Sequence, residues 1–213
     1  MNDVADYEYD LFVSYRRISL TMEWIRDDFL RLFRDRLYLE LGRPPLIFWD
    51  DESVDDGMVP KLEVKRALRT SRSLLSILSG PYFSSPWCRA EWETFRRRAL
   101  VAGLPAGRTL TTPVQWHDGD NYREILSGDG PQAPDFRDYS FPGVSARHTS
   151  ANEAYQRKLM ALAAAVANVI RHAPPYDPDW PLVEPEDTQA PPQVSGGWTY
   201  KLSGQPVGAE VAP

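Results

Sequence analysis

The stretch SSPWCRAEWETF gathers several side chains that could do chemistry. It holds the single cysteine of the chain, Cys88, and the two carboxylates Glu91 and Glu93, beside the indole of Trp87. Ser85 followed by proline predicts a helix that begins here, because serine caps helix N-termini and proline suits the first helical position. Trp87 and Glu91 then share one face. Together they offer an apolar platform and two oxygens, which could accept ribose hydroxyls or stabilise a developing cation.

Each of these residues also has a purely structural interpretation. Glu91 could be a solvated surface glutamate, since charged residues are mostly exposed. Cys88 falls in one stripe with Trp92 and Phe95, which we expect to pack on a sheet, and no histidine lies near Cys88 in sequence to activate its thiol. Glu93 lies about 200° around the helix from Glu91, so we expect it to be a surface charge.

The elements that must position these residues follow from the pattern of apolar runs. Short runs rich in β-formers alternate with segments of helical period, which predicts a parallel sheet covered on both faces. The expected strands are residues 10–15 (DLFVSY), 46–50 (LIFWD), 74–79 (LLSILS) and 111–116 (TTPVQW), with residues 136–141 (FRDYSF) as the candidate for a fifth. The predicted fold class is α/β, a flavodoxin-like doubly wound parallel sheet of about five strands.

Four helices are expected between and after these strands. The first presents an apolar face made of Ile25, Phe29, Leu32, Phe33 and Leu37. The second begins at Pro60 and is expected to bury Leu62 and Leu68. The third begins at the Ser85 cap. A final amphipathic helix covers roughly residues 152–171.

Composition excludes several classes of function. With 213 residues and a net charge of −6, the chain has no bulk charge that favours direct binding to nucleic acid. One cysteine rules out an internal disulfide and a multi-thiolate zinc site, and His117, His148 and His172 lack ligand spacing, so we expect no metal. The first residues do not resemble a signal peptide, and no apolar run is long enough to span a bilayer. We therefore expect a cytoplasmic protein without a membrane partner.

The chain divides by composition near residue 173. We expect one domain over residues 6–173, followed by a proline-rich C-terminal tail or linker over residues 174–213, which holds nine of the nineteen prolines. This tail could be a linker, a strap over the domain or a route to a further domain. Trp180, Trp198 and Tyr200 suggest that parts of it dock.

The predicted sheet selects a set of candidate site residues, because ligands of doubly wound sheets bind at the carboxyl ends of the strands. Those ends carry Tyr15, Arg16, Arg17, Trp49, Asp50 and Ser79, and all should converge with Trp87 and Glu91 on one crevice. The two arginines could pair with phosphates or with nearby carboxylates. No glycine-rich phosphate-binding motif or Walker lysine is present. The acidic run at residues 50–56 could bind a divalent cation, but a solvated loop is the favoured interpretation.

Three ordered segments resemble the Toll/interleukin-1 receptor (TIR) domain. The strand that begins at Tyr9 (YDLFVSY) resembles its first-strand box. Residues 50–57 and the Pro60-led helix resemble its BB loop and second helix. Residues 71–91, which end in WCRAE, are similar to the third strand and W-x-x-x-E helix of bacterial TIR domains. The resemblance covers roughly residues 6–173, although the long first helix and residues 116–150 depart from minimal TIR domains.

The resemblance implies two kinds of function. Many bacterial and plant TIR domains cleave NAD+ at the nicotinamide–ribose bond, whereas animal receptor and adaptor TIR domains assemble signalling complexes. In the enzymes the glutamate that matches Glu91 is catalytic, and the aromatic residue that matches Trp87 packs near the nicotinamide. The arginine pair and the BB loop line the site. NAD+ is then the substrate, and no cofactor is required.

We therefore expect an NAD+ glycohydrolase of the bacterial TIR type, used in immune defence. Its products would be nicotinamide and ADP-ribose or a cyclic ADP-ribose. Family enzymes often complete their sites across subunits, which implies self-association through TIR–TIR contacts, with a sensor or effector protein as a further partner. The alternatives are a non-catalytic scaffold that acts by homotypic assembly and a TIR-like accessory protein of a peptide-maturation cluster.

Overall fold

Four parallel strands form the central sheet of this chain. The computed structural model describes residues 6–50, 61–119, 133–141, 143–146 and 150–188. The strands are β1 (Tyr9–Tyr15), β2 (Ile47–Phe48), β3 (Ser71–Leu78) and β4 (Thr111–Gln115), and their order across the sheet is β2-β1-β3-β4. This order, with all neighbours parallel, brings every strand's carboxyl end to one edge of the sheet.

The sequence placed the four strands correctly and was wrong about a fifth. Residues 136–141 do not form a strand: only Asp135 makes an isolated parallel bridge to Gln115, and the short 3-10 helix η4 (Arg137–Tyr139) follows. The Asp135 carboxylate accepts hydrogen bonds from both the backbone N–H and the guanidinium of Arg137, which turns the chain away from the sheet edge. The sheet of the described residues therefore has four strands.

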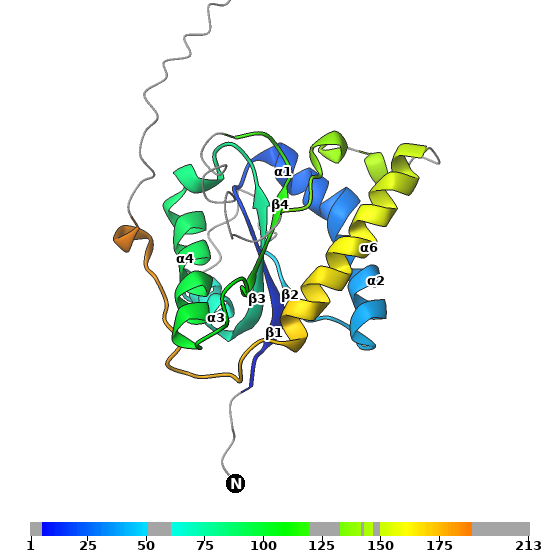
Figure 1. Cartoon of the computed structure of the whole chain (residues 1–213). Helices are drawn as coiled ribbons and strands as arrows, with labels where there is room; N and C mark the ends of the chain where they lie inside the picture. Colours follow the sequence, from blue (N-terminus) through cyan, green and yellow to red (C-terminus); the bar gives the residue numbers. More distant parts are fainter. Residues whose placement is uncertain (1–5, 51–60, 120–132, 142, 147–149, 189–213) are drawn as a thin grey trace, which may run out of the picture.

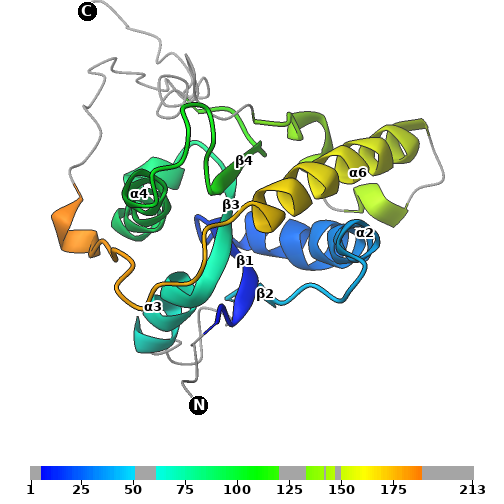
Figure 2. The same cartoon turned by 60° about the horizontal axis from the view of Figure 1, so that its bottom comes forward.

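Helices cover both faces of the sheet (Figures 1 and 2). On one face lie α1 (Ser19–Glu23), the π-helix η1 (Trp24–Phe29), α2 (Leu30–Leu41) and α6 (Ser150–Arg171). On the other face lie α3 (Lys61–Thr70) and α4 (Pro86–Val101). Short 3-10 helices occupy the connections: η2 (Tyr82–Ser84), η5 (Val144–Ala146) and η6 (Pro185–Asp187). The expected doubly wound α/β architecture is confirmed.

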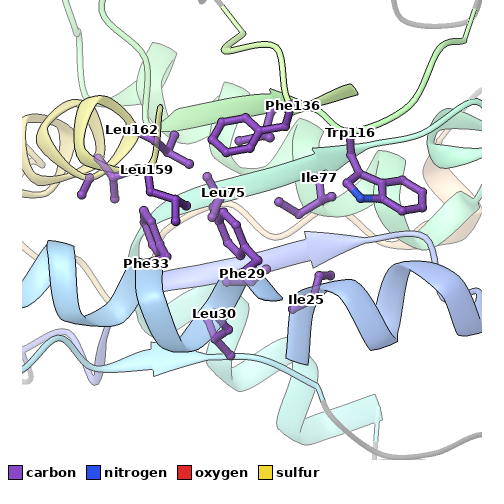
Figure 3. Close-up of a cluster of buried hydrophobic side chains, with 14 of the residues drawn as sticks. Ile25, Phe29, Leu30, Phe33, Leu75, Ile77, Trp116, Phe136, Leu159 and Leu162 are labelled. Atoms are coloured by element: carbon purple, nitrogen blue, oxygen red, sulfur yellow. The ribbon is translucent and has the colours of Figure 1, made fainter. Parts of the chain in front are cut away.

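The larger core fills the face covered by α2 and α6. Alternate residues of β1 point into it, because successive side chains of a strand face opposite sides of the sheet. Figure 3 shows its aromatic and aliphatic side chains, which come from the first helical stretch, the sheet, the turn near Phe136 and α6. The predicted apolar face of the first helix lies here, with Ile25, Phe29, Phe33 and Leu37 fully buried.

The second core lies between the sheet and the α3–α4 layer. It contains Phe12 and Leu74 from the sheet, Leu68 from α3 and Phe95 from α4. The expectation that α3 also buries Leu62 is wrong, since Leu62 is 77% exposed. Leu62 and Leu68 are six residues apart and so lie about 120° apart around the helix, which lets only one of them face the core.

The first part of the proline-rich segment packs against the domain. The indole of Trp180 is buried and its Nε1 donates to the hydroxyl of Tyr7 at 3.2 Å, while the backbone N–H of Val183 donates to the Thr94 hydroxyl of α4 at 3.0 Å. Arg98 of α4 lies 5.6 Å from the Trp180 ring. Residues 174–188 are therefore a strap across α4. Trp198 and Tyr200 lie outside the described residues.

No helix in the described part of the chain has the length and apolar character needed to cross a membrane.

Two leucines of α3 give a matched test of this packing. Leu68→Ala removes a side chain that is 1% exposed, so we expect the free energy of unfolding to fall by about 3 kcal/mol. Leu62→Ala changes an exposed side chain of the same helix and should alter it by less than about 0.5 kcal/mol. Urea denaturation of both variants measures the difference, and equal effects would contradict the placement of α3.

Candidate functional site

The side chains of Ser14 and Glu91 meet where β1 approaches α4. The Ser14 hydroxyl donates to Glu91 Oε2 at 2.5 Å, and the hydroxyls of Ser14 and Tyr82 are 2.6 Å apart. Ser14 is the penultimate residue of β1, Tyr82 begins η2 in the connection between β3 and α4, and Glu91 lies in the second turn of α4. Three separate elements thus bring polar groups to one buried point near the carboxyl edge of the sheet.

The start of α4 is fixed by the predicted cap. Ser85 has extended backbone angles, and its hydroxyl accepts the N–H of Cys88 at 3.4 Å, with Pro86 as the first helical residue. The Cys88 thiol in turn donates to the backbone carbonyl of Tyr15 at 3.5 Å. These contacts tie the first turn of the helix to the end of β1, so they also fix Glu91 one turn later.

Glu91 is buried, contrary to the interpretation of a solvated surface glutamate. Only 8% of its surface is exposed, and removal from water raises the pKa of its carboxyl to about 7. The Ser14 hydrogen bond and the positive charge of Arg17 act in the opposite direction, because both favour the ionised form. At neutral pH the carboxyl is therefore close to its midpoint, which is typical of groups at functional sites.

Tyr15, Arg17 and Asp50 form a second cluster at the same edge. The Tyr15 hydroxyl donates to the Asp50 backbone carbonyl at 2.6 Å, and the Arg17 guanidinium forms an ion pair with the Asp50 carboxylate. The pairing of Arg17 with a nearby carboxylate is the structural alternative that the sequence left open. Arg16 is exposed.

The remaining predicted residues lie on the elements that the sequence assigned to them. Ser79 follows β3 and is buried, and its hydroxyl has no hydrogen-bond partner among the described residues. The half-buried Trp49 follows β2 and packs against the larger core, while its indole N–H also lacks a partner within the described ranges. Trp87 is half-buried, one turn before Glu91 on α4. Beyond Asp50, the predicted acidic loop lies outside the described residues.

A comparison with known families finds a match over this part of the chain. Residues 8–103 match the family model of the TIR domain. This match spans less than half of the 213 residues, so it shows that this segment is similar to the TIR domain. The matched segment runs from the start of β1 past the end of α4, so it contains all eight of the predicted site residues.

Two further comparisons accompany this match to the TIR domain. A solved structure, the TIR domains of the activated Roq1 resistosome directly recognising the pathogen effector XopQ, aligns with 21% identity and a TM-score of 0.34. The alignment covers 76% of this chain and 84% of that one, and at this TM-score the likeness supports no conclusion about function. No curated protein matches the chain in sequence.

Two other polar residues of α4 have structural roles. Burial raises the pKa of the Cys88 thiol far above its usual range, so the thiol is a packing group that joins Leu78, Tyr82 and Phe83. Glu93 pairs with Arg96 and Arg97 on the outer side of α4, as a surface charge should. In the described part of the domain, no group of three or more potential ligands lies close enough to hold a metal ion.

Ser14 lies at a predicted strand end, but neither it nor Tyr82 was expected to be a site residue. Both positions are buried, and Ser14 is a polar residue on the face of β1 that approaches α4. The available signal for Ser14 was a polar residue within the mainly apolar segment LFVSY. Tyr82 gave no signal, because its contact with Ser14 depends on how η2 folds back under β3, across 68 residues of sequence.

The buried carboxyl makes the stability of the folded chain depend on pH. The pKa of Glu91 is about 7 in the folded chain against a reference value of 4.5, so folding favours the protonated form. The stability that this provides is fully present below about pH 4.5 and is lost as the pH rises through 7. Glu91→Gln removes the ionisation, and we expect this variant to be more stable than the wild type by about 3 kcal/mol at pH 8.

Urea denaturation of both proteins between pH 4.5 and pH 8 checks this expectation, with the difference shrinking toward the acidic end. Glu93→Gln is the control on the same helix. The pKa of Glu93 is lowered by its hydrogen bond with Arg96, so this variant should not gain stability at pH 8. A pH-independent difference for Glu91→Gln would contradict the burial of an ionisable carboxyl.

Proposed function

We propose that this chain cleaves NAD+ at the nicotinamide–ribose bond, with Glu91 as the catalytic carboxylate. The observation that carries the proposal is the buried Glu91 carboxyl, which accepts a hydrogen bond from Ser14 at 2.5 Å and titrates near neutral pH. It lies in a segment that matches the TIR domain. It also ends a W-x-x-x-E sequence, which resembles the pattern whose glutamate is catalytic in NAD-cleaving TIR domains. The use of the reaction in bacterial immune defence is part of the same proposal.

The chemistry of the bond suits a single carboxylate. When the bond between ribose C1′ and the pyridinium nitrogen breaks, the electron pair stays with nicotinamide, which leaves as a neutral molecule and needs no general acid. Positive charge then develops on the ribose, as in glycoside cleavage. A carboxylate held in a dry site stabilises that charge more strongly than it would in water. Glu91 is buried in this way.

The ribosyl cation can react in two ways, and each completes a balanced reaction. Water adds at C1′ and releases one proton, which gives ADP-ribose, or an atom of the adenine or ribose of the same molecule adds and gives a cyclic product. The half-buried Trp87, one turn before Glu91, provides an apolar surface for the nicotinamide ring. Arg16 and Arg17 are the groups that would bind the diphosphate, with Arg17 exchanging its Asp50 partner for phosphate.

We expect Glu91→Gln to lower NAD+ cleavage by at least about 100-fold, because the neutral amide cannot stabilise the developing cation. The full-length protein is incubated at high concentration with NAD+, and nicotinamide release is followed by chromatography. Glu93→Gln, which alters a surface carboxylate on the same helix, should retain activity. Full activity of Glu91→Gln would reject the proposal. So would inactivity of wild-type protein that light scattering shows to be assembled.

The pH dependence of cleavage adds a second readout in the same assay. Because the ionised form is required and the pKa of Glu91 is about 7, kcat/KM of the wild type should fall below pH 7 by roughly tenfold per pH unit.

We further propose that activity requires self-association. Leu62 supports this, because it is a large apolar side chain, 77% exposed, in the first turn of α3, next to the segment that resembles the BB loop. We expect specific activity to rise with protein concentration and Leu62→Glu to abolish that rise without unfolding the protein. Light scattering and the NAD+ assay measure both effects, and activity independent of concentration in both proteins would contradict the requirement.

A further inference from the structure

Ser14 lies on the face of β1 that approaches α4. Its strand neighbour two positions earlier, Phe12, packs in the core between the sheet and α4, so the alternation of the strand aims both side chains at the same layer. The residue beside it on β3 is Ser76. Ser14 is 1% exposed, and its hydroxyl is the group that donates to the Glu91 carboxyl in the described structure.

The proton count fixes the direction of the contacts. A serine hydroxyl has one proton to donate, and an ionised carboxylate can only accept. When Glu91 is ionised, Ser14 donates to Glu91 Oε2, and the Tyr82 hydroxyl at 2.6 Å must donate to Ser14. The three groups then form a chain of two hydrogen bonds that ends on the carboxylate. Two short hydrogen bonds in series strengthen each other in a buried environment.

Aromatic packing holds the far end of this chain. The Tyr82 side chain is fully buried, and its ring meets Phe83 edge to face at 4.8 Å. Phe83 in turn meets Trp92, the residue after Glu91 on α4, at 5.4 Å. The Tyr82 ring is therefore linked through Phe83 to α4, the helix that carries the Glu91 carboxyl. Both ends of the hydrogen-bond chain are thus held by the packing of the same helix.

We propose that Ser14 is a positioning residue for Glu91, held in its own place by Tyr82, and that this hydroxyl chain fixes the carboxylate oxygen and favours its ionised form. The catalytic part of this inference rests on the proposed function. Its physical content, the contact between hydroxyl and carboxylate, can be measured without NAD+.

The groups that face Glu91 allow the contribution of Ser14 to be separated from others. Arg17, after β1, lowers the pKa of the Glu91 carboxyl through its charge. Tyr82 in η2 and Cys88 in α4 have pKa values raised by burial, so both stay neutral through the neutral range. Only Ser14 contributes a side-chain hydrogen bond to the carboxyl among the described residues, so Ser14→Ala removes that bond together with the contact to Tyr82.

The test compares Ser14→Ala, Ser14→Thr and Tyr82→Phe in the full-length protein. The Glu91 carboxyl is titrated by carbon-13 NMR on glutamate-labelled protein, with its signal identified by its absence in Glu91→Gln. We expect Ser14→Ala to raise the pKa of Glu91 by about one pH unit or more, because a hydrogen bond to the charged form is lost. Ser14→Thr should restore the wild-type titration, and Tyr82→Phe should shift it in the same direction by less.

Ser73→Ala is the matched control. Ser73 is also a buried strand serine, but its hydroxyl donates to the Asp10 backbone carbonyl at 2.9 Å instead of to Glu91. Its loss should leave the Glu91 titration unchanged. An unchanged Glu91 pKa in both Ser14→Ala and Tyr82→Phe would overturn the inference, and Tyr82→Phe decides alone if Ser14→Ala does not fold.

The NAD+ assay on the same proteins separates this inference from the proposed function. We expect Ser14→Ala to lower kcat about tenfold at pH 7 with KM changed less than threefold, and to move the acidic limb of the pH profile upward. If wild-type protein releases no nicotinamide while Ser14→Ala still shifts the titration, the catalytic proposal fails and the positioning inference stands. If NAD+ is cleaved and neither the titration nor the profile moves, the inference fails alone.

Discussion

The contact between the Ser14 hydroxyl and the buried Glu91 carboxyl is the interaction on which the candidate site depends. A carboxyl removed from water is costly to ionise, and here that cost is large enough to bring its pKa to about 7. The serine hydroxyl and the nearby Arg17 charge offset part of it. Hydrogen bonds of 2.5 Å between β1 and α4 and of 2.6 Å between β1 and η2 tolerate little movement of these elements. The surrounding structure must therefore hold β1, η2 and α4 in fixed positions.

The packing of α4 meets this requirement along its length. Its first turn is capped by Ser85 and joined to the end of β1 through Cys88. Further along α4, Phe95 packs in the core between the sheet and the α3–α4 layer. The buried Arg98 guanidinium donates to the backbone carbonyls of Ser71 and Leu68. Burial lowers the pKa of Arg98 to about 10, so the guanidinium remains charged at neutral pH. The helix is thus bound to β3 as well as to β1.

The strap at residues 174–188 adds a third support to the same helix. The strap contacts α4 at two points: Val183 contacts Thr94, and Thr188 contacts Arg89. Lys65 of α3 pairs with Glu184 of the strap, which links the two helices of this layer. On the opposite face, the larger aromatic core packs against the sheet and includes Leu11, Val13 and Tyr15 of β1 (Figure 3). Stability of the whole layer and geometry at Glu91 are therefore linked.

Much of the fold was determined by local patterns. Apolar runs located the four strands, helical periodicity located the long helices, and serine followed by proline fixed the first residue of α4. The same local reasoning paired Trp87 with Glu91 and collected the residues at the strand ends. It was wrong about Leu62 and about the fifth strand, where the turn at Arg137 depends on a side chain binding its own backbone.

The sequence by itself determined the α/β class, the edge of the sheet that carries the polar residues, and the choice of Glu91 as the carboxylate of interest. Only the tertiary structure decided that Glu91 is buried, that Ser14 and Tyr82 hold it, and that Arg17 pairs with Asp50. The physical reason is that a side chain's burial and hydrogen-bond partners depend on residues distant in the chain, here 77 positions apart for Ser14 and Glu91. Strand and helix periodicity depend on near neighbours, which a sequence displays directly.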